Sequence, residues 1–198
     1  MARAFSDSEK TLIKAKLKKG AIEFIQRYGI RKASVEELVE YAGISKGAFY
    51  LFYESKELLF FEAILEYHSQ LHEAVSASIS NLKGKVTVDD LTGILFKVIK
   101  DNQSFWISLL SDGNLEYIQR KLPEQMLEMH LFDDDRFFHE IILMANVDSN
   151  IDTPLVAGTF RAIFLTILNI EIIGEDIYDD VLRALLKSVF QQFFYSKE

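Results

Sequence analysis

Apolar residues at helical spacing occur along most of the chain, and they constrain its fold more than any other feature. In residues 13–28 they recur at intervals of three and four, which places them on one face of a helix. A similar stripe occupies residues 177–194. Only two prolines and nine glycines interrupt the 198 residues, and no stretch shows convincing β-strand alternation. The sequence therefore predicts an all-α fold of about nine helices.

Capping residues predict where these helices begin and end. Gly29 is placed to end the first helix, because glycine accepts positive φ without strain. Ser34 and Glu37 have the spacing of a capping box, and Gly43 follows that short second helix. Further helices are expected after Ser45, at about 56–80, after Thr87, near 103–111, 114–121 and 123–144, and at about 154–174 and 176–195.

Composition narrows the class of protein. The chain has no cysteine, which excludes disulfides and thiolate metal sites and allows a reducing cytoplasm. The N-terminal residues contain no apolar run of signal-peptide length. The most apolar stretch, residues 155–173, is interrupted by Arg161, Asn169 and Glu171, which would be costly inside a bilayer. We therefore expect a soluble, cytoplasmic protein in which this stretch forms a deeply buried helix.

Charge is distributed unevenly. Residues 1–60 carry a net charge of +3, whereas residues 61–198 carry −11, giving −8 for the whole chain. A basic head on an acidic body suggests that only the head meets a polyanion, although the asymmetry alone is weak support. The predicted domains are a head at 1–55 and a larger body at 56–198, connected by the long fourth helix.

The stretch GISKGAFYLFYESKELL, residues 43–59, points to nucleic acid binding. Two short helices joined by Ala42-Gly43-Ile44 have the dimensions of a helix-turn-helix. Apolar residues can pack the pair against the first helix, which leaves small, basic and phenolic side chains outside. In this motif the second helix enters the major groove of DNA. The packing set is Leu38, Ala42, Ile44, Phe49 and Phe52, and the outer set is Ser45, Lys46, Gly47, Ala48 and Tyr50.

The next junction predicts a phosphate contact. Ser55 can cap the fourth helix, whose N-terminal N–H groups favour an anion. Lys56 stands in the first turn, where a cation opposes the helix dipole. Helix stability does not account for this lysine, whereas anion binding does.

Residues 10–65 resemble the TetR family of bacterial transcriptional regulators. The resemblance is carried by Gly29-Ile30 with Ser34, by residues 42–50 (AGISKGAFY) and by residues 55–59 (SKELL). It implies a homodimeric, ligand-responsive repressor, with helices one to three on DNA, an effector in the acidic body, and the last two helices pairing between subunits. Carried over by position, the major-groove residues are Ser45, Lys46, Gly47, Ala48 and Tyr50, and the phosphate contacts are Ser34, Tyr53 and Lys56.

Two assignments in the head stay open at this point. The family usually has His or Tyr followed by Phe where this chain has Phe52-Tyr53. We expect Tyr53 at the DNA backbone and Phe52 in the core. Arg31 and Lys32 either contact phosphate or belong to a solvated turn.

The body offers aromatic side chains for an effector cavity, although the same rings could fill the core. A mainly apolar effector is the default, and a cationic one is conceivable given the acidic body. His68 and His72 are spaced as a metal pair but lack a third ligand, so no metal or cofactor is expected. The candidate pocket residues are Phe60, Tyr67, Phe96, Phe105, Trp106, Phe137 and Phe164.

The last two helices are predicted to form a dimer interface. Residues 155–173 are apolar nearly all round and the last helix has a broad stripe, so one chain offers few partners for both. A thick single-chain core is the alternative. The chain shows no nucleophile motif or phosphate loop, so we expect no enzyme. A helical module that binds a protein or lipid without binding DNA is the alternative function.

Overall fold

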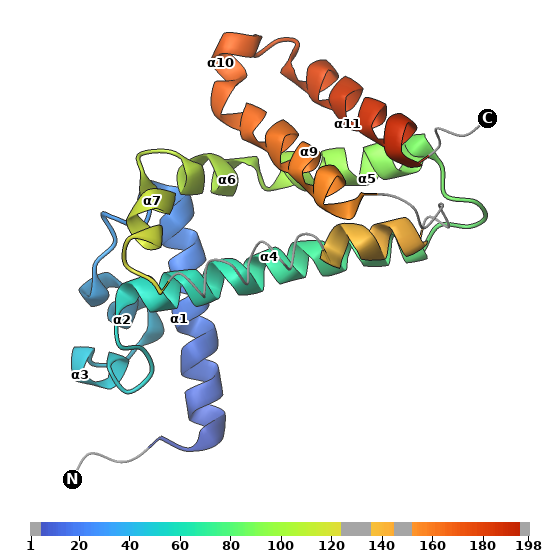
Figure 1. Cartoon of the computed structure of the whole chain (residues 1–198). Coiled ribbons are helices and arrows are strands. Elements are labelled where there is room, and N and C mark those ends of the chain that lie inside the picture. Colours follow the sequence, from blue (N-terminus) through green and yellow to red (C-terminus); the bar gives the residue numbers. More distant parts are fainter. Residues whose placement is uncertain (1–4, 124–135, 145–151, 195–198) are drawn as a thin grey trace. The chain divides into compact units, whose positions relative to one another are not determined.

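The computed structural model describes residues 5–123, 136–144 and 152–194 (Figure 1). Within these ranges the regular structure is helical, so the predicted all-α class is confirmed. Residues 136–144 are also helical, whereas the first part of the helix predicted at 123–144 lies outside the described residues. The helices are α1 (Asp7–Tyr28), α2 (Val35–Ala42), α3 (Lys46–Phe49), α4 (Lys56–Ser80), α5 (Val88–Asp101), α6 (Gln103–Leu110), α7 (Asn114–Gln119), α9 (Thr153–Leu165), the 3-10 helix η1 (Thr166–Asn169), α10 (Ile170–Ile173) and α11 (Tyr178–Phe194).

The chain divides into two compact units. The first contains residues 1–68 and 104–124, and the second contains residues 69–103 and 125–198. The first unit is larger than the predicted head at 1–55, because it also includes the start of α4, nearly all of α6, and α7.

The core of the first unit forms around one stripe of α1. Leu17, Ala21 and Ile25 are fully buried, as the periodicity predicts. Helix α2 packs against this stripe at very close range, because a Cβ on Gly20 would lie 2.7 Å from the Tyr41 ring. Helix α3 packs on α2 in turn and buries Phe49 completely.

The predicted caps are present. The Ser34 hydroxyl accepts a hydrogen bond from Glu37 N, and the Glu37 side chain accepts one from Ser34 N, completing the capping box of α2. Gly43 ends α2 in the left-handed region, at φ 73° and ψ 37°. Gly29 ends α1 at φ 80° and ψ 172°, a region that is essentially restricted to glycine. These local signals fix the path of the chain from α1 through α3.

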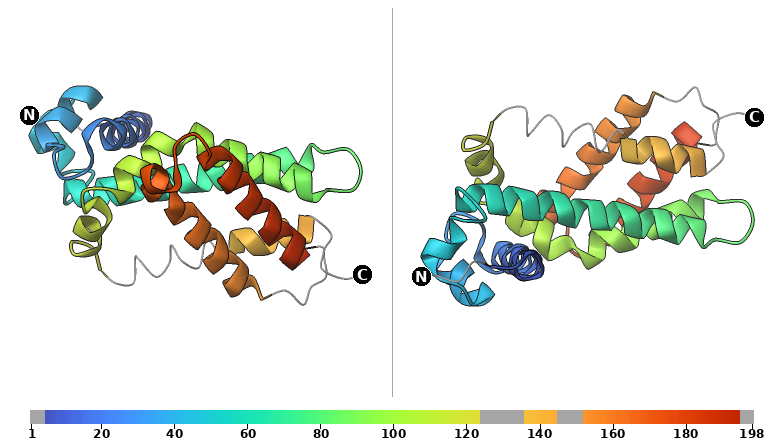
Figure 2. Two further views of the ribbon diagram at one scale, coloured as in Figure 1. Left: turned by 90° about the horizontal axis from the view of Figure 1, so that it is seen from above. Right: turned by 90° about the horizontal axis from the view of Figure 1, so that it is seen from below.

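The second unit is built around α11, which packs against α5 and α9 (Figure 2). One face of α11 supplies Leu182, Leu186 and Phe190, all fully buried. Two ion pairs tie α11 to α5: Lys100 Nζ lies 2.7 Å from the Asp179 carboxylate, and Lys187 Nζ lies 2.8 Å from that of Asp89. The apolar stripe predicted for residues 177–194 is therefore only partly buried within the chain.

Residues 153–173 correct one prediction. They do not form one deeply buried helix, because α9 gives way to η1 and then α10. By length and composition the segment could cross a membrane, yet only 28% of its most apolar window is buried within the chain. Apolar side chains with 42–85% exposure remain on its surface, namely Leu155, Leu165, Leu168 and Ile172.

Candidate DNA-binding surface

The outer face of α3 brings together the residues predicted for the major groove. The Ser45 hydroxyl accepts a 3.1 Å hydrogen bond from Ala48 N and so caps the helix. Lys46 and Gly47 are exposed, Ala48 is half-buried, and Tyr50 is 52% exposed. Since Phe49 is buried beneath them, α3 is anchored on one side and open on the other. The predicted orientation of Lys46 and Tyr50 away from the core is confirmed.

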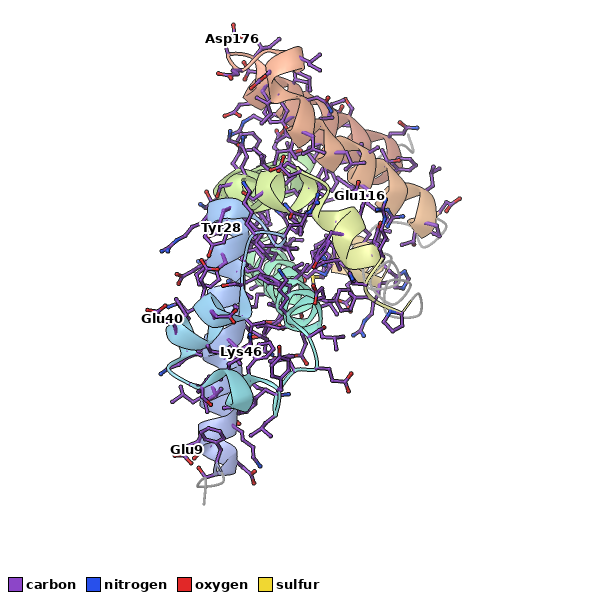
Figure 3. The ribbon with its side chains drawn as sticks, turned by 90° about the vertical axis from the view of Figure 1, so that its left-hand side faces the viewer. Glu9, Tyr28, Glu40, Lys46, Glu116 and Asp176 are labelled. Atoms are coloured by element: carbon purple, nitrogen blue, oxygen red, sulfur yellow. The ribbon has the colours of Figure 1, made fainter. Side chains whose placement is uncertain are left out.

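Lys46 has a partner that the sequence reasoning missed. Its ammonium lies 2.5 Å from the Glu36 carboxylate in the first turn of α2, and both side chains are more than half exposed. The Lys46 hydrogen bond lowers the pKa of Glu36, and the same bond raises the pKa of Lys46. The exposed face thus carries a carboxylate next to Lys46, its main cation. Figure 3 labels Lys46 together with Glu40, which lies on α2.

The expectation for Phe52 and Tyr53 was wrong. Tyr53 is only 6% exposed, and its hydroxyl donates a 2.5 Å hydrogen bond to Glu62, whereas Phe52 is half-buried beside Phe5. The reason is spacing: Tyr53 N donates to Phe49 O, so Tyr53 lies one turn after the buried Phe49. Burial first, then the bond to Glu62, raises the pKa of the Tyr53 hydroxyl. This geometry does not support Tyr53 as a phosphate contact.

Replacing Tyr53 by phenylalanine tests this correction. We expect the free energy of unfolding to fall by about 1 kcal/mol, since one hydrogen bond is lost and the ring stays in place. We expect DNA affinity to stay within about twofold of wild type, since the hydroxyl serves the fold. Urea denaturation and fluorescence anisotropy measure the two effects. A large loss of affinity without a loss of stability would restore the phosphate contact.

Lys56 has a structural role that the sequence reasoning did not find. Its Nζ donates to backbone carbonyls of the turn between α1 and α2, at 2.6 Å from Ala33 O, 3.3 Å from Arg31 O and 3.4 Å from Ile30 O. The inference that stability cannot account for this lysine is therefore wrong. The Lys56 ammonium donates hydrogen bonds to carbonyl groups of another segment. These bonds offset its unfavourable interaction with the dipole of its own helix.

Lys56→Met is accordingly expected to lower the free energy of unfolding by about 1.5 kcal/mol, because hydrogen bonds to charged groups are the stronger ones. The urea midpoint measures this. Lys83→Met, an exposed lysine after α4, is the matched control and should leave the midpoint unchanged. If both variants unfold alike, the three carbonyl contacts contribute nothing and an anion contact again explains the residue.

Asn114 is a second residue that the sequence reasoning missed. It begins α7, is 3% exposed, and joins that helix to the turn after α1. Its Oδ1 accepts from Ile30 N at 3.1 Å and Arg31 N at 3.3 Å. Its Nδ2 donates to Ser108 O at 2.8 Å and Ser111 O at 3.1 Å. One buried amide thus fixes the segment that leads into the helix-turn-helix.

The remaining predicted phosphate contacts lie near this turn. Arg31 and Lys32 are exposed, but the Arg31 guanidinium also donates to Asp112 O at 3.3 Å. The Ser34 hydroxyl donates to Glu37 at 2.7 Å within its capping box. Ser34 therefore acts as the helix cap predicted from its spacing, and its hydroxyl proton is engaged within the chain.

The candidate effector residues fall in both units. In the first, Phe60 and Phe105 are fully buried, and the Tyr67 ring lies 4.4 Å from that of Phe105. In the second, Phe96 and Phe137 are less than 10% exposed. These four phenylalanines belong to the cores of the two units, which is the alternative to lining a cavity. The half-buried members of the candidate set are Tyr67, Trp106 and Phe164.

The two histidines considered as metal ligands make aromatic contacts. His68 lies edge-on to Trp106, and His72 stacks on Phe137 at 3.7 Å between ring centroids. Within residues 5–123, 136–144 and 152–194 no group of three His, Asp or Glu side chains is placed to hold a metal ion.

A glycine turn between two short helices, with a small outer helix that carries Lys46, has the geometry of a helix-turn-helix. Residues 17–63 match the family model described as bacterial regulatory proteins, tetR family. The chain is 34% identical over 86 residues to YdgC and 28% identical over 122 residues to YuxN, two uncharacterized HTH-type transcriptional regulators of Bacillus subtilis. These matches cover 43% and 56% of the chain but only 40% of the length of each relative.

Similarity to solved structures extends over most of the chain. A Mesorhizobium loti protein assigned to the TetR family superposes with a TM-score of 0.64 at 16% identity, covering 93% of this chain and 98% of that one. FadR of Bacillus subtilis, solved with stearoyl-CoA, gives 0.58 at 20% identity, covering 93% and 99%. At these identities the similarity shows the fold. Together with the matched helix-turn-helix, it makes the chain similar to bacterial regulatory proteins of the tetR family.

Proposed function

We propose that the chain is a cytoplasmic, ligand-responsive repressor that binds a palindromic operator as a homodimer. The observation that carries the proposal is the outer face of α3. Ser45, Lys46, Gly47 and Tyr50 are all exposed there, while Phe49 holds the helix to the core. Small side chains let the backbone approach the bases, and Lys46 and Tyr50 supply donors for bases or phosphates.

Charge supports DNA as the partner. The net charge of +3 on residues 1–60 contrasts with −11 on the rest of the chain, so a polyanion is attracted to the head and repelled elsewhere. Binding through phosphate neutralisation weakens as salt rises. A two-fold dimer would place its two α3 helices in major grooves about 34 Å apart or at a multiple of that spacing.

The exposed apolar side chains of the second unit support the homodimer. Leu165 at the end of α9, Leu168 in η1 and Ile172 in α10 are 42–85% exposed. Ile177 and Leu185, before and within α11, are 48% and 37% exposed. Apolar surface of this kind marks a site of association. Light scattering on the purified chain tests this: two chains per particle are expected, and a monomer at micromolar concentration would contradict the proposal.

The proposed effector is small and mainly apolar. Among proteins of the same fold, FadR of Bacillus subtilis was solved with stearoyl-CoA and SmeT with triclosan, and both ligands have large apolar parts. An effector that binds better to the DNA-free form would release the operator by shifting populations. Ligand retained on the purified protein can be identified by mass spectrometry and then tested for DNA release.

Anisotropy with labelled DNA from upstream of the chain's own gene tests the central proposal. We expect saturable binding at low salt, with an affinity that falls steeply as salt rises. An excess of unrelated duplex should compete weakly. If no duplex binds at low salt, DNA recognition is excluded and the protein- or lipid-binding module becomes the better reading.

A further inference from the structure

The pair formed by Glu36 and Lys46 is unusual for a surface that is meant to meet DNA. Lys46 is the cation of the α3 outer face, and its ammonium is held 2.5 Å from the Glu36 carboxylate. The Glu36 side chain is 64% exposed and the Lys46 side chain is 54% exposed, so both are within reach of a ligand. A carboxylate at this place opposes phosphate binding, and an exposed ion pair contributes little to stability. Glu36 does gain from the α2 dipole, since it stands in the first turn of that helix, but its ion pair with Lys46 adds little stability.

We propose that Glu36 is a specificity-determining residue that weakens binding to unrelated DNA and reads an amino group of the operator. This inference rests on the proposed DNA-binding function. On unrelated DNA, Lys46 must leave Glu36 to reach a phosphate, and the carboxylate is left facing a polyanion. At the operator, the N4 amino group of a cytosine donates to the carboxylate in place of the ammonium. Lys46 is then free for a guanine or a phosphate.

Neighbouring carboxylates are differently placed. Glu37 is tied to Ser34 within the capping box and also accepts from the Tyr28 hydroxyl at 3.0 Å. Glu40 is exposed one turn after Glu36 on α2. Glu40 carries the same charge as Glu36, but it is Glu36 that forms the ion pair with Lys46. Glu40 is therefore a matched control for the effect of net charge alone.

The test compares Glu36→Gln and Glu40→Gln with wild type, on the operator and on an unrelated duplex. We expect Glu36→Gln to bind the unrelated duplex about five to ten times more tightly and the operator no more tightly than wild type. The slope of log affinity against log salt on the unrelated duplex should steepen by about 0.9, since one more phosphate is neutralised. Glu36→Gln/Lys46→Gln should lose this gain. Equal effects of Glu36→Gln and Glu40→Gln, or equal gains on both duplexes, would overturn the inference.

A modified operator tests the base contact. Each cytosine of a half-site is replaced in turn by 2-pyrimidinone, which lacks the N4 amino group. One replacement should weaken wild type about tenfold and leave Glu36→Ala unaffected, because alanine has no acceptor for the amino group, and uniform effects at every position would overturn the contact. If wild type binds no duplex, the proposed function fails as well. If wild type binds and Glu36→Gln behaves like it, only the specificity role of Glu36 fails.

Discussion

Replacing Asn114 by leucine is expected to lower the free energy of unfolding by about 3 kcal/mol. Leucine has a similar size but neither donates nor accepts, so the N–H groups of Ile30 and Arg31 lose their acceptor. Ile30 is fully buried, and an unpaired buried N–H costs about 1–3 kcal/mol by itself. The carbonyls of Ser108 and Ser111 lose a donor in the same substitution.

Two measurements separate this effect from a general loss of packing. Urea denaturation gives the free energy, and hydrogen exchange should show faster exchange of the Ile30 and Arg31 amides. Asn114→Asp keeps the acceptor but sets a buried carboxylate against the carbonyls of Ser108 and Ser111, so it should destabilise at least as much as leucine at neutral pH. Asn81→Leu, at an exposed position after α4, is the matched control. Unchanged amide exchange in Asn114→Leu would contradict the role given to this side chain.

Asn114 also shows why part of the surface could not be predicted. Its backbone partners lie 83 and 84 residues earlier in the chain, and no spacing rule covers such a distance. Lys56 is similar, because its carbonyl partners lie 23 to 26 residues away. By contrast, Ser34, Gly43 and Ser45 act within three or four residues, and their roles as helix caps and turn follow from local chemistry.

Phe52 and Tyr53 fall between the local roles that sequence predicts and the long-range contacts that it does not. The helical spacing that buries Phe49 also predicts which later residue shares its direction, and that residue is Tyr53, four places on. The family resemblance singles out the pair but does not indicate that Tyr53 shares the direction of Phe49. Hydrophobicity favoured phenylalanine inside, whereas the bond from the Tyr53 hydroxyl to Glu62 lets tyrosine be buried with its polar group satisfied.

Residues 153–173 show a limit of a different kind. Their composition predicts burial, and the separate prediction of a dimer interface concerns the same side chains. The two predictions agree only if a second copy covers the exposed leucines and isoleucines, because the segment buries Val156, Phe160 and Ile163 within the chain but leaves Leu165, Leu168 and Ile172 exposed. Burial predicted from sequence therefore does not distinguish a core from an interface.

Replacing Gly47 by glutamate is expected to weaken operator binding at least about 100-fold while the fold is retained. Apart from its chain neighbours and the backbone of its own helix, no described atom lies within 4 Å of a Cβ built at this exposed position, so the chain accepts a side chain there. Glutamate is also the better helix former, so α3 is not weakened. The new side chain would project from the face proposed to enter the major groove, adding both bulk and a negative charge where the duplex must approach.

The control uses the same substitution in the second unit. Gly93 in α5 is another glycine whose Cβ position is open, and Gly93→Glu changes the net charge by the same amount. We expect operator affinity within about twofold of wild type for Gly93→Glu, and unchanged melting temperatures for both variants. Gly47→Ala adds only a methyl group and should lose less than about tenfold. Operator affinity that survives Gly47→Glu would mean that α3 does not enter the groove, because no duplex could approach this face without meeting the added carboxylate.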